Sequence, residues 1–287
     1  NDKTSNDKWG KTADIKYKYD KKIITYFNKL PNDCTHLDYG SGNGAMSKYI
    51  LNKNKNNISY SIDIKDYRSD ELKNNKNNIF IENVNINIIN NEIKNNTVDL
   101  ITALNSLHHI EFKHMKHDEI IDNIIDSFYR ILKPGGFLLI KEHNATSIDD
   151  LYPIICQHMM YHIVECKDIN SIEDVKNIIN NYHITDKAWY MSKKYLHKKL
   201  INKGFKLVYT VDKKNENKVY DSLFVKPYED SNQIIKNCMP DYKNTNKNNI
   251  KIVDSSRYSI TNKKDSNTII KDLTIDKPLN EVRITDA

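Results

Sequence analysis

Three glycines within five positions mark the stretch of the chain best suited to binding a ligand. Gly40, Gly42 and Gly44 follow a short apolar strand that ends at Asp38, and a helix is expected from Met46 onward. Glycine permits a sharp turn and a close approach of the backbone to a ligand, because a Cβ would block both. The spacing also satisfies a relaxed dinucleotide fingerprint. Asp38 would repel a pyrophosphate, however, and favours a ligand that carries an ammonium group.

A second group of reactive side chains lies at Lys141–Asn144, directly after an apolar strand expected at Phe137–Ile140. The carboxyl end of a strand is where open α/β sheets bind their ligands. We therefore expect Lys141, Glu142 and His143 to be the catalytic residues. Glu142 and His143 could serve as a base or as an orienting pair for a substrate nucleophile. The alternative is a polar strand end that faces solvent.

A helix and a glycine pair must position this second group. Residues Glu119–Leu132 place their apolar side chains on one face, which is typical of an amphipathic helix. Pro134 is expected to end that helix, and Gly135 and Gly136 are expected to turn the chain into the next strand.

Two runs, D-x-G-x-G-x-G from Asp38 and R-x-L-K-P-G-G from Arg130, resemble motifs of class I S-adenosylmethionine (SAM) dependent methyltransferases, in the same order and at a similar separation.

This resemblance implies an α/β fold with a doubly wound, mostly parallel seven-stranded sheet and a C-terminal antiparallel hairpin. It implies SAM as the cofactor, with its methionine part at Asp38 and the glycine loop. The residues expected to bind the cofactor are Asp38, Gly40, Ser41, Gly42, Gly44, Asp63, Ile64, Asn83 and Asn105.

The second and third strands supply the expected nucleoside contacts. Asp63 ends a strand at Ile58–Ile64, about 20 residues beyond the glycine loop, where an acidic residue accepts hydrogen bonds from ribose hydroxyls. Ile64 or Lys65 would lie beside the adenine. The family usually has an acidic residue after the third strand, expected here at Ile79–Ile81. This chain has Glu82-Asn83-Val84-Asn85, so the amide carbonyl of Asn83 or Asn85 would have to accept the adenine hydrogen bond.

The run Asn105-Ser106-Leu107-His108-His109-Ile110 follows a buried strand expected at Thr97–Leu104. It is similar to the fourth motif of family members that methylate small molecules, among many others. We expect His108 to pack under the cofactor and His109 to line the substrate pocket. Adjacent histidines with no Cys or Asp partner nearby make a poor zinc signature, so the sequence predicts no metal site.

An inserted helix at Ile148–Lys167 is expected to lie across the mouth of the pocket. His158, Tyr161 and His162 recur at spacings of three and four, so they share one face and could contact the substrate together. A strand end K-E-H-N followed by a helix with H-x-x-Y is more loosely similar to methyltransferases of large DNA viruses. The strongly Asn- and Lys-rich composition is compatible with that source.

The remaining pattern predicts two further helices and a hairpin. A helix at Ser192–Gly204 has Ser192 as its N-cap and Gly204 as its stop, and another is expected at Ser171–Tyr182. Strands at Phe205–Val211 and Val219–Val225 would form the hairpin. The domains expected are a flexible N-terminus at residues 1–8, a methyltransferase domain at 9–227 with a helical insert at 148–190, and a polar tail or interdomain linker at 228–287.

The composition indicates which partners and which cellular compartment to expect. The net charge of +6 permits an anionic partner such as RNA, although a lysine-rich solvated surface explains it equally well. The four cysteines form no C-x-x-C pair, which favours reduced thiols and a cytoplasmic location. No apolar run reaches the roughly 18 residues of a membrane span, so no membrane partner is expected. A chain beginning at Asn1 is expected to be part of a longer polypeptide or complex.

The sequence thus predicts methyl transfer from SAM, with RNA as the first choice of acceptor, at a cap or a ribose hydroxyl. The basic charge, the virus-like resemblance and Lys141 favour RNA. A small-molecule acceptor is the alternative, because of the L-H-H-I run. A third hypothesis is a catalytically inactive, methyltransferase-like binding or stimulatory subunit, because two acidic residues that the family usually carries are missing.

Overall fold

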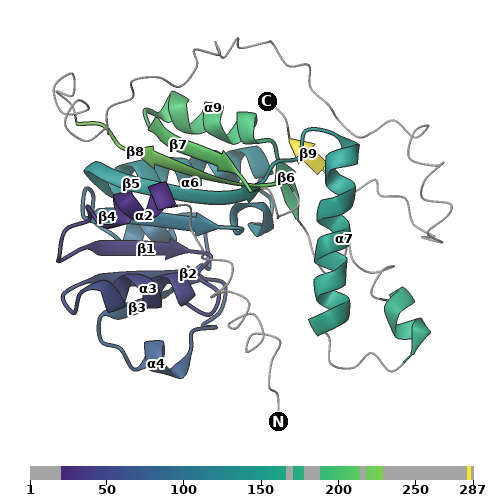
Figure 1. Cartoon of the computed structure of the whole chain (residues 1–287), viewed down its shortest axis with the longest axis horizontal. Coiled ribbons are helices and arrows are strands. Elements are labelled where there is room, and N and C mark those ends of the chain that lie inside the picture. Colours follow the sequence, from purple (N-terminus) through teal and green to yellow (C-terminus); the bar gives the residue numbers. More distant parts are fainter. Residues whose placement is uncertain (1–20, 166–170, 178–187, 214–217, 229–282, 286–287) are drawn as a thin grey trace.

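The computed structural model describes residues 21–165, 171–177, 188–213, 218–228 and 283–285, without the side chains of residues 21, 148, 160–165 and 283–285. A seven-stranded sheet with the strand order β3-β2-β1-β4-β5-β8-β7 forms its centre (Figure 1). The first five strands of this order are parallel, and β8 and β7 form an antiparallel hairpin on β5. The predicted fold class is therefore confirmed. The strands are β1 (Thr35–Tyr39), β2 (Ile58–Asp63), β3 (Asn78–Glu82), β4 (Val98–Leu104), β5 (Leu132–His143), β7 (Lys206–Asp212) and β8 (Val219–Val225).

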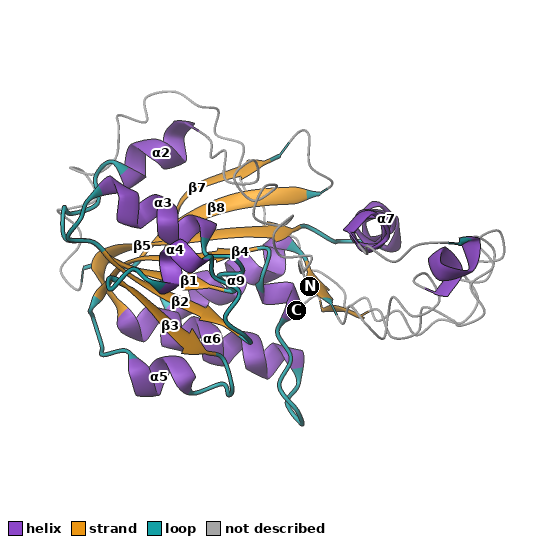
Figure 2. Cartoon of the chain, turned by 90° about the horizontal axis from the view of Figure 1, so that it is seen from below, coloured by secondary structure: helices purple, strands orange, loops and turns teal. Residues whose placement is uncertain are grey.

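Helices cover both faces of the sheet, as Figure 2 shows. One face carries α2 and α3, and the other carries α5, α6 and α9. The central strand β4 reads VDLITAL, a nearly continuous apolar run typical of a parallel strand that is buried on both faces. The helices are α2 (Lys21–Phe27), α3 (Ala45–Lys53), α4 (Asp70–Lys73), α5 (Ile88–Glu92), α6 (His117–Ile131), α7 (Ile148–Glu165) and α9 (Lys193–Lys203), with a 3₁₀ turn η1 (Leu107–His109).

The strand order fixes where a ligand can bind. From β1 the chain adds β2 and β3 on one side of the sheet and then returns to add β4 and β5 on the other. The order therefore reverses between β1 and β4. Open α/β sheets bind their ligands at such a switch point, beyond the carboxyl ends of the strands. The glycine loop follows β1 at this edge, and η1 follows β4.

The run Lys133–Gly136 does not form the separate turn that was predicted between a helix and a strand. Helix α6 ends at Ile131, and β5 begins at once at Leu132 and runs through the glycine pair. Gly135 adopts a φ of +80°, and its N–H donates to the carbonyl of Lys226 at 2.7 Å. The prediction of a separate turn was therefore wrong, because Lys226, the residue directly after β8, exchanges backbone hydrogen bonds with Gly135 and Gly136 and joins this segment to the sheet.

The predicted caps of α9 are confirmed. The Oγ of Ser192 accepts a hydrogen bond from the N–H of Tyr195 at 3.1 Å, and Gly204 ends the helix with a φ of +113°. Hydroxyl N-caps and left-handed glycine stops are local signals, so they can be recognised without tertiary information.

Helix α7 stands apart from the layered body, beyond the carboxyl ends of β4 and β5 (Figure 1). A short strand β6 (Trp189–Met191) follows and pairs in parallel with β9 (Arg283–Thr285). Strand β9 belongs to the segment predicted as a tail or linker. Most of that segment, the predicted flexible N-terminus and much of the predicted helix at 171–182 lie outside the described residues, so the domain boundaries stay predictions. Within the described residues, no helix combines the length and apolar character needed to cross a lipid bilayer.

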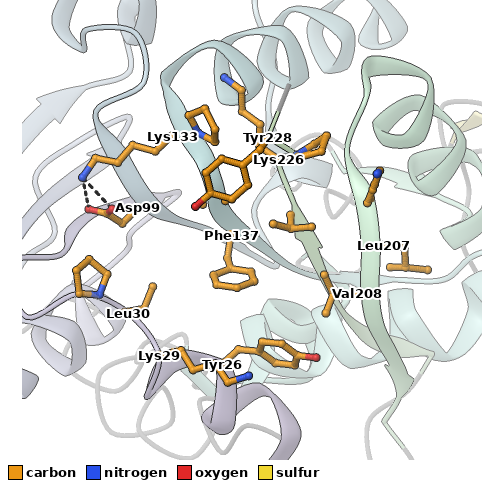
Figure 3. Close-up of a pocket in the computed structure, with 17 residues that line it drawn as sticks. Tyr26, Lys29, Leu30, Asp99, Lys133, Phe137, Leu207, Val208, Lys226 and Tyr228 are labelled. Carbon is orange, nitrogen blue, oxygen red and sulfur yellow. Dashed lines mark hydrogen bonds and ion pairs between the residues drawn. The ribbon is translucent and has the colours of Figure 1, made fainter. Parts of the chain in front are cut away.

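A cavity of about 400 Å³ opens near the amino end of β5 (Figure 3). Tyr26, Phe137, Val208 and Tyr228 contribute to its lining, and the ion pair of Lys133 with Asp99, 2.8 Å long, lies beside it. This is the opposite edge of the sheet from the glycine loop. The cavity is therefore not the predicted cofactor site.

Candidate active site

The glycine loop is tied to the end of β2 by backbone hydrogen bonds. The N–H groups of Gly40 and Ser41 both donate to the carbonyl of Ile62, at 2.9 and 3.0 Å. The N–H of Gly42 donates to the carboxylate Oδ2 of Asp63 at 2.7 Å. The structure thus brings together the loop and the acidic residue that were predicted from separate parts of the sequence.

Each glycine of the loop has a positive φ, of +69° at Gly40, +52° at Gly42 and +78° at Gly44. A Cβ on Gly40 would lie 2.2 Å from the Cβ of Ser106, and one on Gly44 would lie 2.4 Å from a methyl group of Leu72. A Cβ on Gly42 would meet no atom within 4 Å among the described residues. Gly40 and Gly44 are therefore required by packing within the protein, whereas Gly42 borders open space in which a ligand can approach the backbone.

The carboxyl group of Asp38 faces the protein interior. Its Oδ1 accepts from the hydroxyl of Thr102 at 2.9 Å, and its Oδ2 accepts from the hydroxyl and the N–H of Ser47 at 3.1 and 3.3 Å. Only 3% of the residue is exposed. Asp38 thus anchors the first turn of α3, where a negative charge favours the helix N-terminus. Its predicted contact with a ligand ammonium group stays a prediction.

Asp38 belongs to a buried polar network that also includes His36. The two ring nitrogens of His36 lie 2.9 Å from the hydroxyl of Ser59 and 2.9 Å from that of Thr102. Because Thr102 donates to Asp38, it accepts from the Nε2–H of His36, and the imidazole is neutral. Burial lowers the pKa of His36 to about 3 and raises the pKa of Asp38 to about 7.

These pKa values predict opposing effects of pH on stability. Between 3.8 and about 7 folded Asp38 holds a proton that the unfolded chain has lost, so its contribution to stability falls as pH rises. Between about 3 and 6.5 the unfolded chain protonates His36 and the folded chain does not, so this contribution rises with pH. We expect Asp38→Asn to remove the first effect and keep the second, so that its free energy of unfolding rises by about 3 kcal/mol relative to that of the natural chain from pH 4 to pH 7.

Urea denaturation across this pH range measures the prediction. The matched variant His36→Gln should change in the opposite direction relative to the natural chain, because it keeps the titration of Asp38 and loses that of His36. Identical pH profiles for Asp38→Asn and the natural chain would show that this carboxyl group is ionised in both states and would contradict the assignment.

The predicted nucleoside contacts lie together at the ends of β2 and β3. The Oδ1 of Asp63 accepts from the N–H of Ile64 at 2.8 Å, and the carbonyl of Asp63 accepts from the N–H of Asn83 at 2.7 Å. The side-chain amide of Asn83 donates to the hydroxyl of Tyr39 at 3.2 Å. Ile64 is 67% exposed, so its apolar side chain could cover one face of a base. Burial raises the pKa of Asp63 above its ordinary value.

Two buried polar atoms at this edge lack a hydrogen-bond partner among the described residues, namely Oγ of Ser41 and Oδ1 of Asn105. Asn105 also has a φ of +52°, and its N–H donates to the carbonyl of Lys141 at 2.6 Å. Unsatisfied buried polar groups are costly and are normally paired. The amino and carboxylate groups of a bound methionine moiety would supply such partners, so the residues present fit the predicted cofactor.

Glu142 lies beneath the loop after β4 rather than in an open pocket. Its Oε1 accepts from the N–H groups of Ser106 and Leu107 at 3.1 and 2.8 Å, and its Oε2 lies 2.5 Å from Nδ1 of His108. The residue is 1% exposed. Each carboxylate oxygen is thus engaged within the protein. The geometry favours Glu142 as a positioning residue for His108 over its predicted role as a catalytic base, which stays untested.

Histidines from three elements converge above Glu142. The Nε2 atoms of His143 and His158 lie 3.2 Å apart, and the ring of His108 is 5.2 Å from that of His143 and 5.6 Å from that of His158. The exposed ring of His109 packs on His108 with centroids 4.1 Å apart. The structure therefore unites His143, predicted to be catalytic, with His109 and His158, predicted to contact the substrate.

Lys141 is 1% exposed and pairs with Asp221 of the hairpin in the register of the sheet. A role for Lys141 in chemistry therefore stays a prediction. The backbones of Tyr161 and His162 continue α7, but their side chains lie outside the described residues.

Residues missed from the sequence complete the site. The hydroxyl of Tyr190 lies 3.0 Å from Nδ1 of His158, and the ring of Tyr190 stacks on His108 with centroids 5.6 Å apart. Ser106 donates to the carbonyl of Tyr39 at 2.9 Å and so joins the loops after β1 and β4. The only sequence signal for Tyr190 is the short apolar run Trp189–Met191, and Ser106 lies in the run Asn105–Ile110 but was given no role there.

Comparison with known proteins identifies the family of this chain. A family model described as a methyltransferase domain matches residues 12–210, more than half of the chain. No curated protein matches. One similar solved structure is a SAM-dependent methyltransferase from Methanosarcina mazei, with 18% identity, a TM-score of 0.49, and coverage of 72% of this chain and 98% of that one. Another is a SAM-dependent methyltransferase from Aquifex aeolicus, with 16% identity, a TM-score of 0.45, and coverage of 71% and 88%.

A third is the N-methyltransferase NodS from Bradyrhizobium japonicum in complex with S-adenosylhomocysteine, with 13% identity, a TM-score of 0.45, and coverage of 68% and 79%. The looser resemblance to viral enzymes gains no support from these comparisons. The family match spans β1 to β7, and so contains the glycine loop, Asp63 and the histidines. The residues of the glycine loop fit S-adenosylmethionine as the predicted cofactor, and the chain belongs to the methyltransferase domain family and has the class I methyltransferase fold.

Proposed function

We propose that this chain catalyses methyl transfer from SAM to a hydroxyl group of RNA, at a cap or a ribose. The observation that carries the proposal is the convergence of His108, His143 and His158 at the carboxyl ends of β4 and β5, beside the glycine loop. SAM supplies a methyl group already activated on a sulfonium. The protein has to align the acceptor and remove its proton.

The cofactor residues have separable tasks in this proposal. The carboxylate of Asp63 accepts from the ribose hydroxyls while it keeps its bond to Gly42. Ile64 covers the adenine, and Asn83 faces its edge. Ser41 and Asn105 hold the polar groups of the methionine moiety, which gives partners to the two unsatisfied buried oxygens.

The histidine cluster suits an oxygen acceptor. Imidazole is the side chain best matched to proton transfer near neutral pH. In the transfer, the bond between the methyl carbon and sulfur breaks while a bond between that carbon and the acceptor oxygen forms. The hydroxyl proton leaves through the cluster to water, and a neutral thioether remains. Glu142 holds His108 in place throughout but contacts neither reactant.

RNA is the preferred acceptor because the chain carries a net charge of +6. A specific observation favours a small molecule as the second candidate. Leu151, Ile154 and Ile155 of α7 pack with Ala145 and Tyr190 in an apolar cluster, and Tyr190 of this cluster contacts His158. The third hypothesis, an inactive stimulatory subunit, is motivated by the absence of the usual acidic residues after β3 and β4.

The experiment incubates the protein with methyl-labelled SAM and, in separate reactions, capped RNA, uncapped RNA or a small-molecule extract. The RNA is digested, and the labelled products are identified by mass spectrometry. We expect label on a ribose or cap hydroxyl, lost in His143→Ala although that variant still binds SAM. Label found only in a small-molecule extract would overturn RNA as the acceptor. SAM binding without transfer to any acceptor would instead favour a stimulatory subunit.

A further inference from the structure

The histidine cluster has the composition and spacing of a metal site. Within the described part of the chain, His108, His143 and His158 each offer a ring nitrogen, and these three atoms lie within 4.8 Å of one another. His108 and His143 are buried and His158 is partly buried. The sequence predicted no metal, because the three histidines are spread over η1, β5 and α7 and form no motif.

Hydrogen bonds on the far side of two of these rings determine which nitrogen faces the centre. His108 presents Nδ1 to the carboxylate of Glu142 at 2.5 Å, and His158 presents Nδ1 to the hydroxyl of Tyr190 at 3.0 Å. If each Nδ1 carries the proton and donates it outward, each Nε2 keeps its lone pair for a ligand. Histidines that bind metals almost always have such outer partners, and a carboxylate behind the ring is a frequent one.

We propose that His108, His143 and His158 bind a divalent transition-metal ion of the zinc class through their Nε2 atoms. Three histidines with a fourth position open to water or substrate are the donor set of catalytic zinc sites. Imidazole donors without carboxylates suit zinc and its neighbours and disfavour the hard ion Mg²⁺, which prefers oxygen. The carboxylate of Glu142 adds negative charge behind the site without occupying a coordination position.

The distances fit such an ion after a small rearrangement. In a tetrahedral zinc site, with bonds of about 2.0 to 2.1 Å, neighbouring ligand nitrogens are about 3.3 Å apart. His143 and His158 already have Nε2 atoms 3.2 Å apart. The remaining separations, of at most 4.8 Å, would shorten by rotation of the rings. Because His158 lies on α7 and the other two ligands lie on η1 and at the end of β5, a bound ion would join α7 to these two elements.

A hydrogen bond between His143 and His158 also accounts for their 3.2 Å contact. The third imidazole, the carboxylate behind His108 and the hydroxyl behind His158 carry the argument further. Such outer partners are expected when each inner nitrogen must act as an acceptor toward a cation.

The ion would also have a role in the proposed function, and this part of the inference depends on that function. A hydroxyl bound at the fourth position would have its pKa lowered, so it could lose its proton to water at neutral pH. His143 would then act as a ligand and not as the base itself.

The test uses the full-length protein without a histidine tag, stripped with a chelator and titrated with Zn²⁺, Co²⁺ and Mg²⁺ by calorimetry. We expect one Zn²⁺ per chain with micromolar or tighter affinity, the visible absorption of tetrahedral Co²⁺, and no binding of Mg²⁺. His143→Ala and His158→Ala should each weaken Zn²⁺ binding about 100-fold. His114→Asn, which replaces an exposed histidine outside the cluster, should leave it unchanged.

Absence of Zn²⁺ binding to the natural chain would overturn the inference, as would equal binding by His158→Ala, which would place the ion elsewhere. SAM binding is measured separately on the stripped protein, so the two proposals can fail independently. SAM binding and methyl transfer without any metal would leave the proposed function standing and remove the metal site. Zn²⁺ binding without methyl transfer would support the metal site and contradict the proposed function.

Discussion

Replacing Asp63 with alanine should weaken the binding of SAM about 100-fold. The carboxylate of Asp63 lies at the end of β2 and accepts from the N–H of Gly42 at 2.7 Å and from that of Ile64 at 2.8 Å. It retains further lone pairs for the two ribose hydroxyls. Hydrogen bonds to a charged group are the strong ones, so the loss of two outweighs any other single change expected at this site. Calorimetric titration with SAM and S-adenosylhomocysteine measures the effect.

The matched control removes a carboxylate of similar charge outside the loop. Glu71 is an exposed residue on α4 that pairs with Lys48 at 2.6 Å, and Glu71→Ala should bind SAM as the natural chain does. The variant Asp63→Asn should fall between the two, because its amide oxygen still accepts one bond. Undiminished binding by Asp63→Ala, with an unchanged melting temperature, would remove Asp63 from the ribose site.

Gly42→Ala tests the glycine loop of the same proposed cofactor site. Its Cβ would project into space that no described atom fills within 4 Å, so we expect a folded protein with reduced affinity for SAM. Gly204→Ala is the control for backbone strain, because Gly204 also has a positive φ but ends α9. It should lower the melting temperature and leave SAM binding unchanged. If both variants bound SAM normally, the cofactor would not approach Gly42.

The proximity of the glycine loop and Asp63 could be predicted from the sequence because its signals are local. A turn that needs glycine at Gly40 and Gly44, and an acidic residue at the next strand end, follow from backbone geometry within about 30 residues. The direction of the Asp38 side chain could not be predicted. It depends on Thr102, which lies 64 positions away and reaches Asp38 only because β1 and β4 are neighbours in the sheet.

The reacting half was predicted as residue types but not as an arrangement. His108, His143 and His158 come from three elements, and their meeting depends on where α7 crosses the strand ends. Glu142 was expected to act on the substrate because it stands in a polar run at a strand end. The alternation of β5 and the tight loop after β4 bury it instead, and a pattern of residue types carries no information about either.

Replacing Glu142 with alanine should lower the free energy of unfolding by about 3 to 5 kcal/mol. The substitution would leave the N–H groups of Ser106 and Leu107 and the ring N–H of His108 without their acceptor in a site that is 1% exposed. Urea denaturation measures this loss. Glu92→Ala, which removes an exposed carboxylate on α5, should change stability by less than about 1 kcal/mol.

The variant Glu142→Gln separates positioning from folding. Glutamine keeps an oxygen for the two backbone N–H groups but turns an amide N–H toward His108, which must then accept at Nδ1 and carry its proton on Nε2. We expect near-natural stability and SAM affinity, but Zn²⁺ affinity and methyl transfer reduced about 10- to 100-fold. Nitrogen NMR of the imidazole reports the tautomer directly. A structural carboxylate would not select which ring nitrogen His108 presents to the cluster. An unchanged His108 tautomer together with natural Zn²⁺ affinity would therefore show that Glu142 only fills space and accepts the hydrogen bonds of the loop after β4.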